Sequence, residues 1–253
     1  MVKPMRSFER LVAVSLAVYL ASLLMVLTIV FNPPQVPADP SSRKTLTWIV
    51  FNAICLAGVF ASVSPETCSR VFPGKAGGEA SPRRRIEGHH PVCEAFSTHV
   101  VKIGGRVFCA ACTGLFLGGV SAMVFSTAYF VQELSLEKSP QPVLMGVIMV
   151  MLVPLGQAAK GFTRVLLNLV FPIGGMLVLI GLDNLYESLF LNVFITALIV
   201  FWIMVRTIVS SLSHWKTCSS CGSSCTAETD KNFQGLSAST VEGSKQYQHA
   251  EQY

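Results

Sequence analysis

Charged residues are scarce in this sequence. Of its 253 residues only 13% are Asp, Glu, Lys or Arg, whereas 51% are hydrophobic. Soluble domains usually carry about 25% charged residues, and a soluble protein of this composition could not cover its surface with polar side chains. A disordered chain needs low hydrophobicity and high net charge. The composition therefore predicts an all-α membrane protein whose apolar surface contacts the lipid bilayer.

The familiar catalytic motifs are also missing. The sequence contains no Walker loop, no dinucleotide-binding fingerprint, no HExxH pair and no recognisable Ser-His-Asp arrangement. The net charge of +5 could indicate nucleic-acid binding, but in membrane proteins a basic excess usually reports orientation.

Uncharged stretches predict about six transmembrane helices, because a bilayer core of about 30 Å needs around 20 apolar residues per helix. A cleaved signal peptide is not expected at the N-terminus, because the first apolar run is longer than a signal core and lacks a small-residue cleavage site. Since the last three stretches are short, five spans with a re-entrant final pair are the alternative. The predicted spans are residues 11–31, 45–64, 108–131, 143–159, 165–182 and 188–205.

The basic residues predict the orientation of these spans. In the six-span arrangement, 16 of the 19 Lys and Arg residues fall on one side of the membrane. The positive-inside rule places that side in the cytoplasm. We therefore expect a multi-pass protein of the cell membrane, with both termini and the long loop between the second and third spans in the cytoplasm. Nucleic acid is not an expected partner.

The chain divides into four parts on this interpretation. The long loop carries Cys and His residues, and the tail is rich in Ser, Thr and Gln without helical periodicity, which predicts disorder. The parts are two N-terminal helices (1–64), the cytoplasmic Cys/His loop (65–106), a four-helix region (107–210) and a Cys/Ser-rich tail (211–253).

No ionisable residue is expected within a span, which argues against an ion-coupled pump. Asp183 and Glu187 are assigned to a solvated turn between the last two spans. Lys160 and Arg164 are assigned to a short cytoplasmic turn, where they anchor the topology.

Small and amide side chains predict contacts between helices. Gly114, Gly118 and Gly119 place small residues on one face of the third span, which favours close helix packing. Gln157 and Asn168 are candidates for hydrogen bonds between helices.

Six of the eight cysteines form two clusters on the predicted cytoplasmic side. Thiols there stay reduced, so metal binding or redox chemistry is favoured over structural disulfides. In the first cluster, two ligand pairs each have a two-residue gap, the spacing that lets one tight turn reach a zinc ion. The candidate ligands are His90, Cys93, Cys109 and Cys112, with His89 and His99 as further donors.

The segment between the two pairs predicts a β-hairpin. Short β-prone runs at 99–103 and 106–108 flank Gly104-Gly105, a typical two-residue turn. A knuckle, a hairpin and a C-x-x-C that opens a helix resemble the layout of treble-clef zinc sites. The second pair would lie at a helix N-terminus, where the helix dipole favours thiolates.

The second cluster follows the last span and consists of His214, Cys218, Cys221 and Cys225. It is a weaker candidate for a metal site, either separate or shared with Cys109 and Cys112. An unstructured or lipidated tail is the alternative.

The run Cys-Ala-Ala-Cys-Thr-Gly-Leu at 109–115, with Gly118 after it, resembles the C-A-x-C-T-G-[IL]-x-x-G signature of a family of prokaryotic membrane proteins of unknown function. The resemblance covers about 30 residues. The upstream element has the order His-Cys instead of the family's Cys-His, which is compatible with a divergent, archaeal branch. A second family element is matched only by Gln157, Gly161, Arg164 and Asn168. The resemblance strengthens the prediction of a site at these residues, but it implies no activity, because the activity of the family is unknown.

The leading functional hypothesis is a zinc site with a structural, sensing or docking role, because four protein ligands leave no open catalytic position. Iron is also compatible with C-x-x-C pairs. The alternatives are a membrane thiol-disulfide oxidoreductase that uses the C-x-x-C pairs, and a small-solute transporter.

Overall fold

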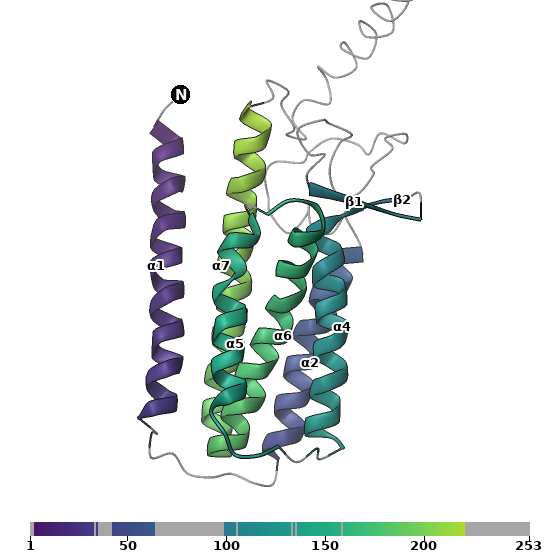
Figure 1. Ribbon diagram of the computed structural model, residues 1–253. Helices are drawn as coiled ribbons and strands as arrows, with labels where there is room; N and C mark the ends of the chain where they lie inside the picture. The colour runs from purple at the N-terminus through teal and green to yellow at the C-terminus, as the bar shows by residue number, and fades with distance from the viewer. Residues whose placement is uncertain are drawn as a thin grey trace, which may run out of the picture.

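The chain folds into a bundle of membrane-length helices with a small β-hairpin at one end (Figure 1). The computed structural model describes residues 3–32, 34, 42–63, 99–104, 106–132, 134, 136–157 and 159–220. The elements are α1 (Lys3–Phe31), α2 (Arg43–Val63), β1 (Val100–Ile103), β2 (Arg106–Cys109), α4 (Ala110–Phe130), α5 (Gln141–Met151), the 3₁₀ helix η2 (Val153–Gln157), α6 (Gly161–Tyr186) and α7 (Leu189–Ser220).

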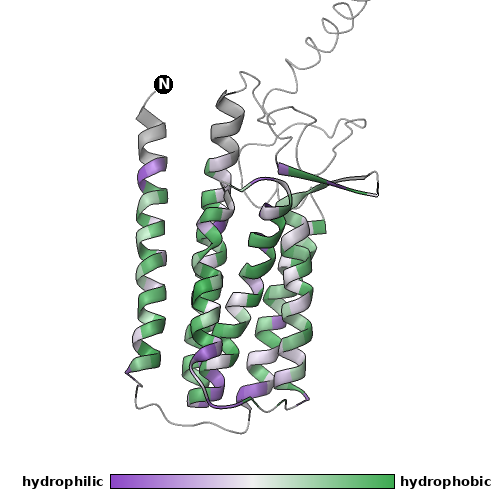
Figure 2. Ribbon diagram, viewed as in Figure 1, coloured by the Kyte–Doolittle hydropathy of each residue, from purple (hydrophilic) through white to green (hydrophobic). Residues whose placement is uncertain are grey.

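Five of these helices are long and apolar enough to cross a membrane, and they lie within α1, α2, α4, α6 and α7. Their outer faces carry large apolar side chains, as Leu24 and Phe60, both more than 60% exposed, illustrate. Figure 2 shows the apolar middle of the helices and more hydrophilic residues at the ends of the bundle. This distribution is compatible with contact to a lipid bilayer and confirms the predicted class of fold.

The helix α5 is shorter than the predicted fourth span because its backbone changes at a proline. It has 11 residues, and η2 follows it directly. Pro154 has no N–H to donate to the carbonyl oxygen of Val150, four residues earlier. The hydroxyl of Tyr19 on α1 donates to that oxygen instead, at 2.5 Å. A side chain from another helix thus satisfies the backbone group that the proline leaves open.

Glycines bring the backbones of α4 and α6 into contact. A Cβ atom added to Gly114 would overlap the carbonyl oxygen of Val165, and one added to Gly118 would overlap that of Leu169. Gly119 faces α2 instead, where an added Cβ would lie 3.0 Å from Val59. The predicted role of these three glycines in close helix packing is confirmed, but the prediction that they share one face was wrong, because Gly119 faces α2 and the other two face α6.

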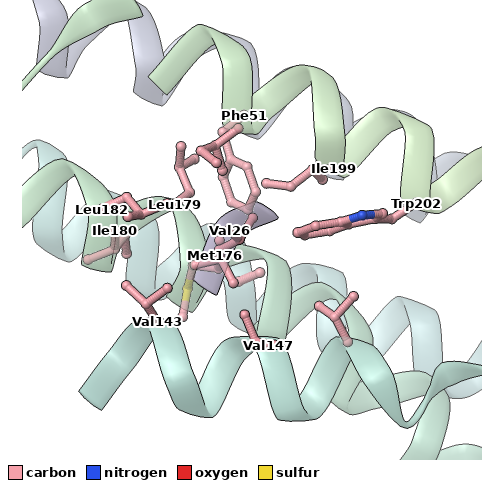
Figure 3. Packing of buried hydrophobic residues seen from close by; sticks show 14 of the residues in the cluster. Val26, Phe51, Val143, Val147, Met176, Leu179, Ile180, Leu182, Ile199 and Trp202 are labelled. Atoms are coloured by element: carbon pink, nitrogen blue, oxygen red, sulfur yellow. The ribbon is translucent and has the colours of Figure 1, made fainter. Parts of the chain in front are cut away.

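Large side chains fill the space between α7 and the rest of the bundle. Figure 3 shows Trp202 and Ile199 of α7 among the buried side chains of other helices, including Phe51 and Met176. Trp202 is fully buried, and its indole N–H donates to the hydroxyl of Ser22 on α1 at 2.8 Å. α7 is therefore held by side-chain packing and polar contacts, in contrast to the backbone contacts between α4 and α6.

The predicted hairpin is present. β1 and β2 pair antiparallel, with Val100 opposite Cys109 and Ile103 opposite Arg106. Gly104 in the turn has φ +57°, a conformation that favours glycine.

The last two helices are longer than predicted. α6 extends four residues beyond Leu182 to Tyr186, and α7 continues to Ser220. The expected tail therefore begins as helix, and residues 221–253 lie outside the described part of the chain.

Candidate functional site

Cys109 and Cys112 lie where the hairpin joins α4. Cys109 is the last residue of β2 and also the N-cap of α4, with extended backbone angles (φ −68°, ψ 120°). Cys112 follows in the first helical turn, where Thr113 donates a hydrogen bond to the carbonyl oxygen of Cys109 at 2.9 Å. The strand end and the helix start thus place both cysteines within one turn, as the C-x-x-C spacing predicted.

His99 comes to the same end of the bundle through the hairpin register. It directly precedes Val100, which pairs with Cys109, and its side chain is buried. Cys109 is also buried, whereas Cys112 is partly exposed.

Arg164 lies beside the two cysteines, in the first turn of α6. Its side chain is only 2% exposed, and it interacts electrostatically with both Cys109 and Cys112. The close approach of α4 and α6 at Gly114 brings the starts of the two helices together. A positive charge near a thiol favours the thiolate, which is both the metal ligand and the nucleophile. Our assignment of Arg164 to a topology-anchoring turn missed this position, whereas Lys160 is exposed as expected.

Of the other predicted metal ligands, the structure describes only some. Within the described ranges, no three His, Cys, Asp or Glu side chains are grouped so that they could hold a metal ion. His89, His90 and Cys93 lie outside the described residues, as do Cys221 and Cys225. Of the second cluster, His214 and Cys218 belong to the last turns of α7.

A second polar site lies at the opposite end of the bundle, centred on Asp183. We expected this residue in a solvated turn, but it lies inside α6 and is 1% exposed. Nε of Arg43, at the start of α2, is 3.1 Å from Asp183 Oδ1, an ion pair without the alignment of a hydrogen bond. The expectation was wrong because α6 continues past Asp183 and turns this residue toward α2.

Neutral donors complete the environment of the Asp183 carboxylate. The hydroxyl of Tyr129 on α4 donates to Oδ2 at 2.9 Å, and the amide of Asn192 on α7 donates to Oδ1 at 2.5 Å. The same amide donates to the hydroxyl of Thr47 on α2 at 3.1 Å. Four helices therefore meet at one buried carboxylate.

Glu187, in contrast, keeps its side chain partly exposed (43%), as its assignment to a turn predicted. It follows α6 in a left-handed conformation (φ 50°), and Lys138 donates a hydrogen bond to its carboxylate at 2.9 Å. This hydrogen bond and the charge of Lys138 lower the pKa of the Glu187 carboxyl.

Arg206 is another charged side chain that we did not expect within a helix of the bundle. It lies in the apolar part of α7, donates to the side-chain oxygen of Asn168 on α6, and lies over the ring of Phe171 with its guanidinium carbon 6.0 Å from the ring centre. The predicted helix-to-helix hydrogen bond of Asn168 is thus confirmed. Together with Asp183 and Arg164, Arg206 shows that the expectation of no ionisable residue within a span was wrong.

Comparison of the chain with models of protein families, with curated proteins and with solved structures finds no match.

Proposed function

We propose that this chain is a six-span protein of the cell membrane, with its termini and its β-hairpin in the cytoplasm. α5 and η2 together form the sixth span. In support, the start of α1, the hairpin and the end of α7 lie at the same end of the bundle (Figure 1). In the six-span arrangement predicted from the sequence, the side with these three segments carries 16 of the 19 basic residues.

We propose that this end of the protein holds a zinc ion through Cys109 and Cys112. The observation that carries the proposal is the position of the two cysteines within one turn at the strand–helix junction. Two thiols in this arrangement fit half of a tetrahedral zinc site. His90 and Cys93 would supply the other half, with His89 and His99 as alternative or hydrogen-bonding donors. Iron is the other metal that this donor set suits.

A four-ligand site would serve a structural, sensing or docking role and not catalysis. When bound, the metal would supply a crosslink between the loop that carries His90 and Cys93 and the start of α4. Cys109 and Cys112 would act as ligands, with the buried guanidinium of Arg164 beside them.

The test is the metal content of the purified full chain. We expect about one equivalent of zinc in the wild type and a loss of most of it in the Cys109→Ser/Cys112→Ser double variant. Cys55→Ser is the matched control, because Cys55 lies in α2 and not in either cluster. Equal metal content in wild type and double variant would refute the zinc site.

The second candidate function is thiol–disulfide exchange by Cys109 and Cys112. The position of Arg164 favours it, since a nearby positive charge activates a thiol for this chemistry. Thiol trapping in cells would detect a reversible Cys109–Cys112 disulfide, with Cys55 as the internal control that stays reduced. Thiols that remain reduced under oxidising conditions would count against this function.

A further inference from the structure

The β-hairpin lies at the level where the apolar core of a membrane ends. β2 runs directly into α4, which begins at Ala110 and has 21 residues. A helix of this length is about 32 Å long and just crosses an apolar core of about 30 Å, so its first residue lies at the boundary with the headgroup layer. From this point the hairpin extends sideways, beyond the edge of the bundle (Figure 1). In a bilayer, its free end therefore lies at the level of the headgroups that surround the protein.

The two faces of the hairpin differ in burial. In an antiparallel pair, residues directly opposite each other lie on the same face, and so does every second residue along a strand. Because Val101 pairs with Phe108 and lies two residues before Ile103, these three residues share one apolar face. On this face Ile103 is 56% and Phe108 is 42% exposed, whereas Cys109 on the other face is buried. The described part of the chain thus leaves much of the apolar face uncovered.

The formal charge of the hairpin is entirely positive. Residues 99–109 include Lys102 and Arg106 and contain no Asp or Glu. Lys102 is exposed near the free end of the hairpin. Basic residues close to an anionic membrane surface are attracted to it, and apolar side chains at this depth become buried at the boundary between headgroups and acyl chains. The charge and the apolar face therefore suit the same partner, an anionic lipid surface.

We propose that the hairpin is an anchor on the membrane surface that prefers anionic lipids. Ile103 and Phe108 insert between the headgroups, and the positive charge of the hairpin attracts the lipid phosphates. The contact extends the lipid-covered surface of α4, where Phe116 and Leu117 are exposed, along the hairpin. The proposal requires that the bundle crosses a membrane, but it depends neither on a bound metal nor on which end faces the cytoplasm.

The experiment is photo-crosslinking from the full chain in vesicles that contain equal amounts of palmitoyloleoylphosphatidylglycerol and palmitoyloleoylphosphatidylcholine. The photoreactive residue p-benzoylphenylalanine replaces Ile103 or, as a second probe that keeps an aromatic ring, Phe108. Since both side chains are exposed, the unfolding midpoint should stay at the wild-type value. We expect lipid adducts from both positions, detected by mass spectrometry. The matched control is the same probe in place of Lys102, which lies on the opposite face and should give few lipid adducts.

A second comparison tests the charge. With the probe at Ile103, phosphatidylglycerol adducts should outnumber phosphatidylcholine adducts about fivefold, the factor expected for one basic residue near an anionic surface. Lys102→Gln/Arg106→Gln should abolish this preference. Lys138→Gln, which removes an exposed cation at the opposite end of the bundle, should leave it unchanged.

Several results would overturn the proposal. The insertion of the apolar face would be refuted by a lack of lipid adducts at both probe positions, by equal adducts from the probes at Ile103 and Lys102, or by crosslinks to a second copy of the chain in place of lipid. The preference for anionic lipids would be refuted by equal adducts of the two lipids, or by a preference that persists in Lys102→Gln/Arg106→Gln.

Discussion

Removal of the Asp183 charge is the sharpest test of the structure. Asp183→Asn preserves the size of the side chain but leaves the guanidinium of Arg43, which is 4% exposed, without its counter-ion 3.1 Å away. Loss of one partner of a buried ion pair typically costs about 3–5 kcal/mol. We therefore expect the free energy of unfolding to fall by about that amount.

The assay is reversible unfolding of the purified chain in mixed micelles by an increasing fraction of sodium dodecyl sulfate, followed by circular dichroism and by tryptophan fluorescence. Buried Trp202 reports on the packing of α7. The matched control is Glu187→Gln, which removes the carboxylate of an exposed pair with Lys138. Exposed ion pairs contribute only about 0–1 kcal/mol, so this variant should remain close to the wild type.

A double-mutant cycle separates the ion pair from other effects of the substitution. Arg43→Gln combined with Asp183→Asn removes both charges, so the double variant should be more stable than the sum of the single losses predicts, by about 1–3 kcal/mol. If Asp183→Asn cost less than about 1 kcal/mol, or if the two losses were simply additive, the buried ion pair would play no part in stability.

Two further predictions concern the backbone contacts between helices. Gly114→Ala should destabilise the protein strongly or prevent folding, because the added methyl group overlaps the carbonyl oxygen of Val165. The control Gly58→Ala should be neutral, because the space around Gly58 is open. Equal unfolding midpoints for the two variants would contradict this packing. Tyr19→Phe should cost about 1 kcal/mol, because the carbonyl oxygen of Val150 loses its side-chain donor and keeps only the N–H of Leu152. Pro154→Ala, which restores a backbone N–H, should reduce that cost. If Tyr19→Phe lowered the free energy of unfolding equally in the wild type and in the Pro154→Ala variant, the Tyr19 hydroxyl would have another role.

The spans and the hairpin were predictable because their signals are local. Four of the five long apolar helices begin and end within a few residues of the stretches expected from hydrophobicity alone, and α7 exceeds its stretch at the C-terminal end. The hairpin followed from β-prone runs around Gly104, whose left-handed conformation suits glycine. The end of α5 at Met151 also has a local cause in the sequence, because Pro154 follows three residues later.

The burial of Asp183 was not predictable in the same way. An acidic residue near the end of an apolar stretch usually marks a solvated turn, and nothing nearby in the sequence indicates otherwise. Its partner Arg43 is 140 positions away in the chain. One signal was present, because Asn192 and Tyr129 also lie near the ends of spans at this side of the membrane, where they could gather around a charge.

By itself, the sequence determined that this is a helical membrane protein, where most of its spans run, and that two cysteines open one of the helices. These properties follow from hydrophobicity and spacing, which act over a few turns of chain. The tertiary structure decided which polar residues face the interior: it pairs Asp183 with Arg43, and it places Arg164 beside Cys109 and Cys112. The physical reason is that glycines, the proline break and large side chains set how far apart the helices lie and how they are rotated. That rotation determines whether a charged residue meets lipid, water or a partner on another helix.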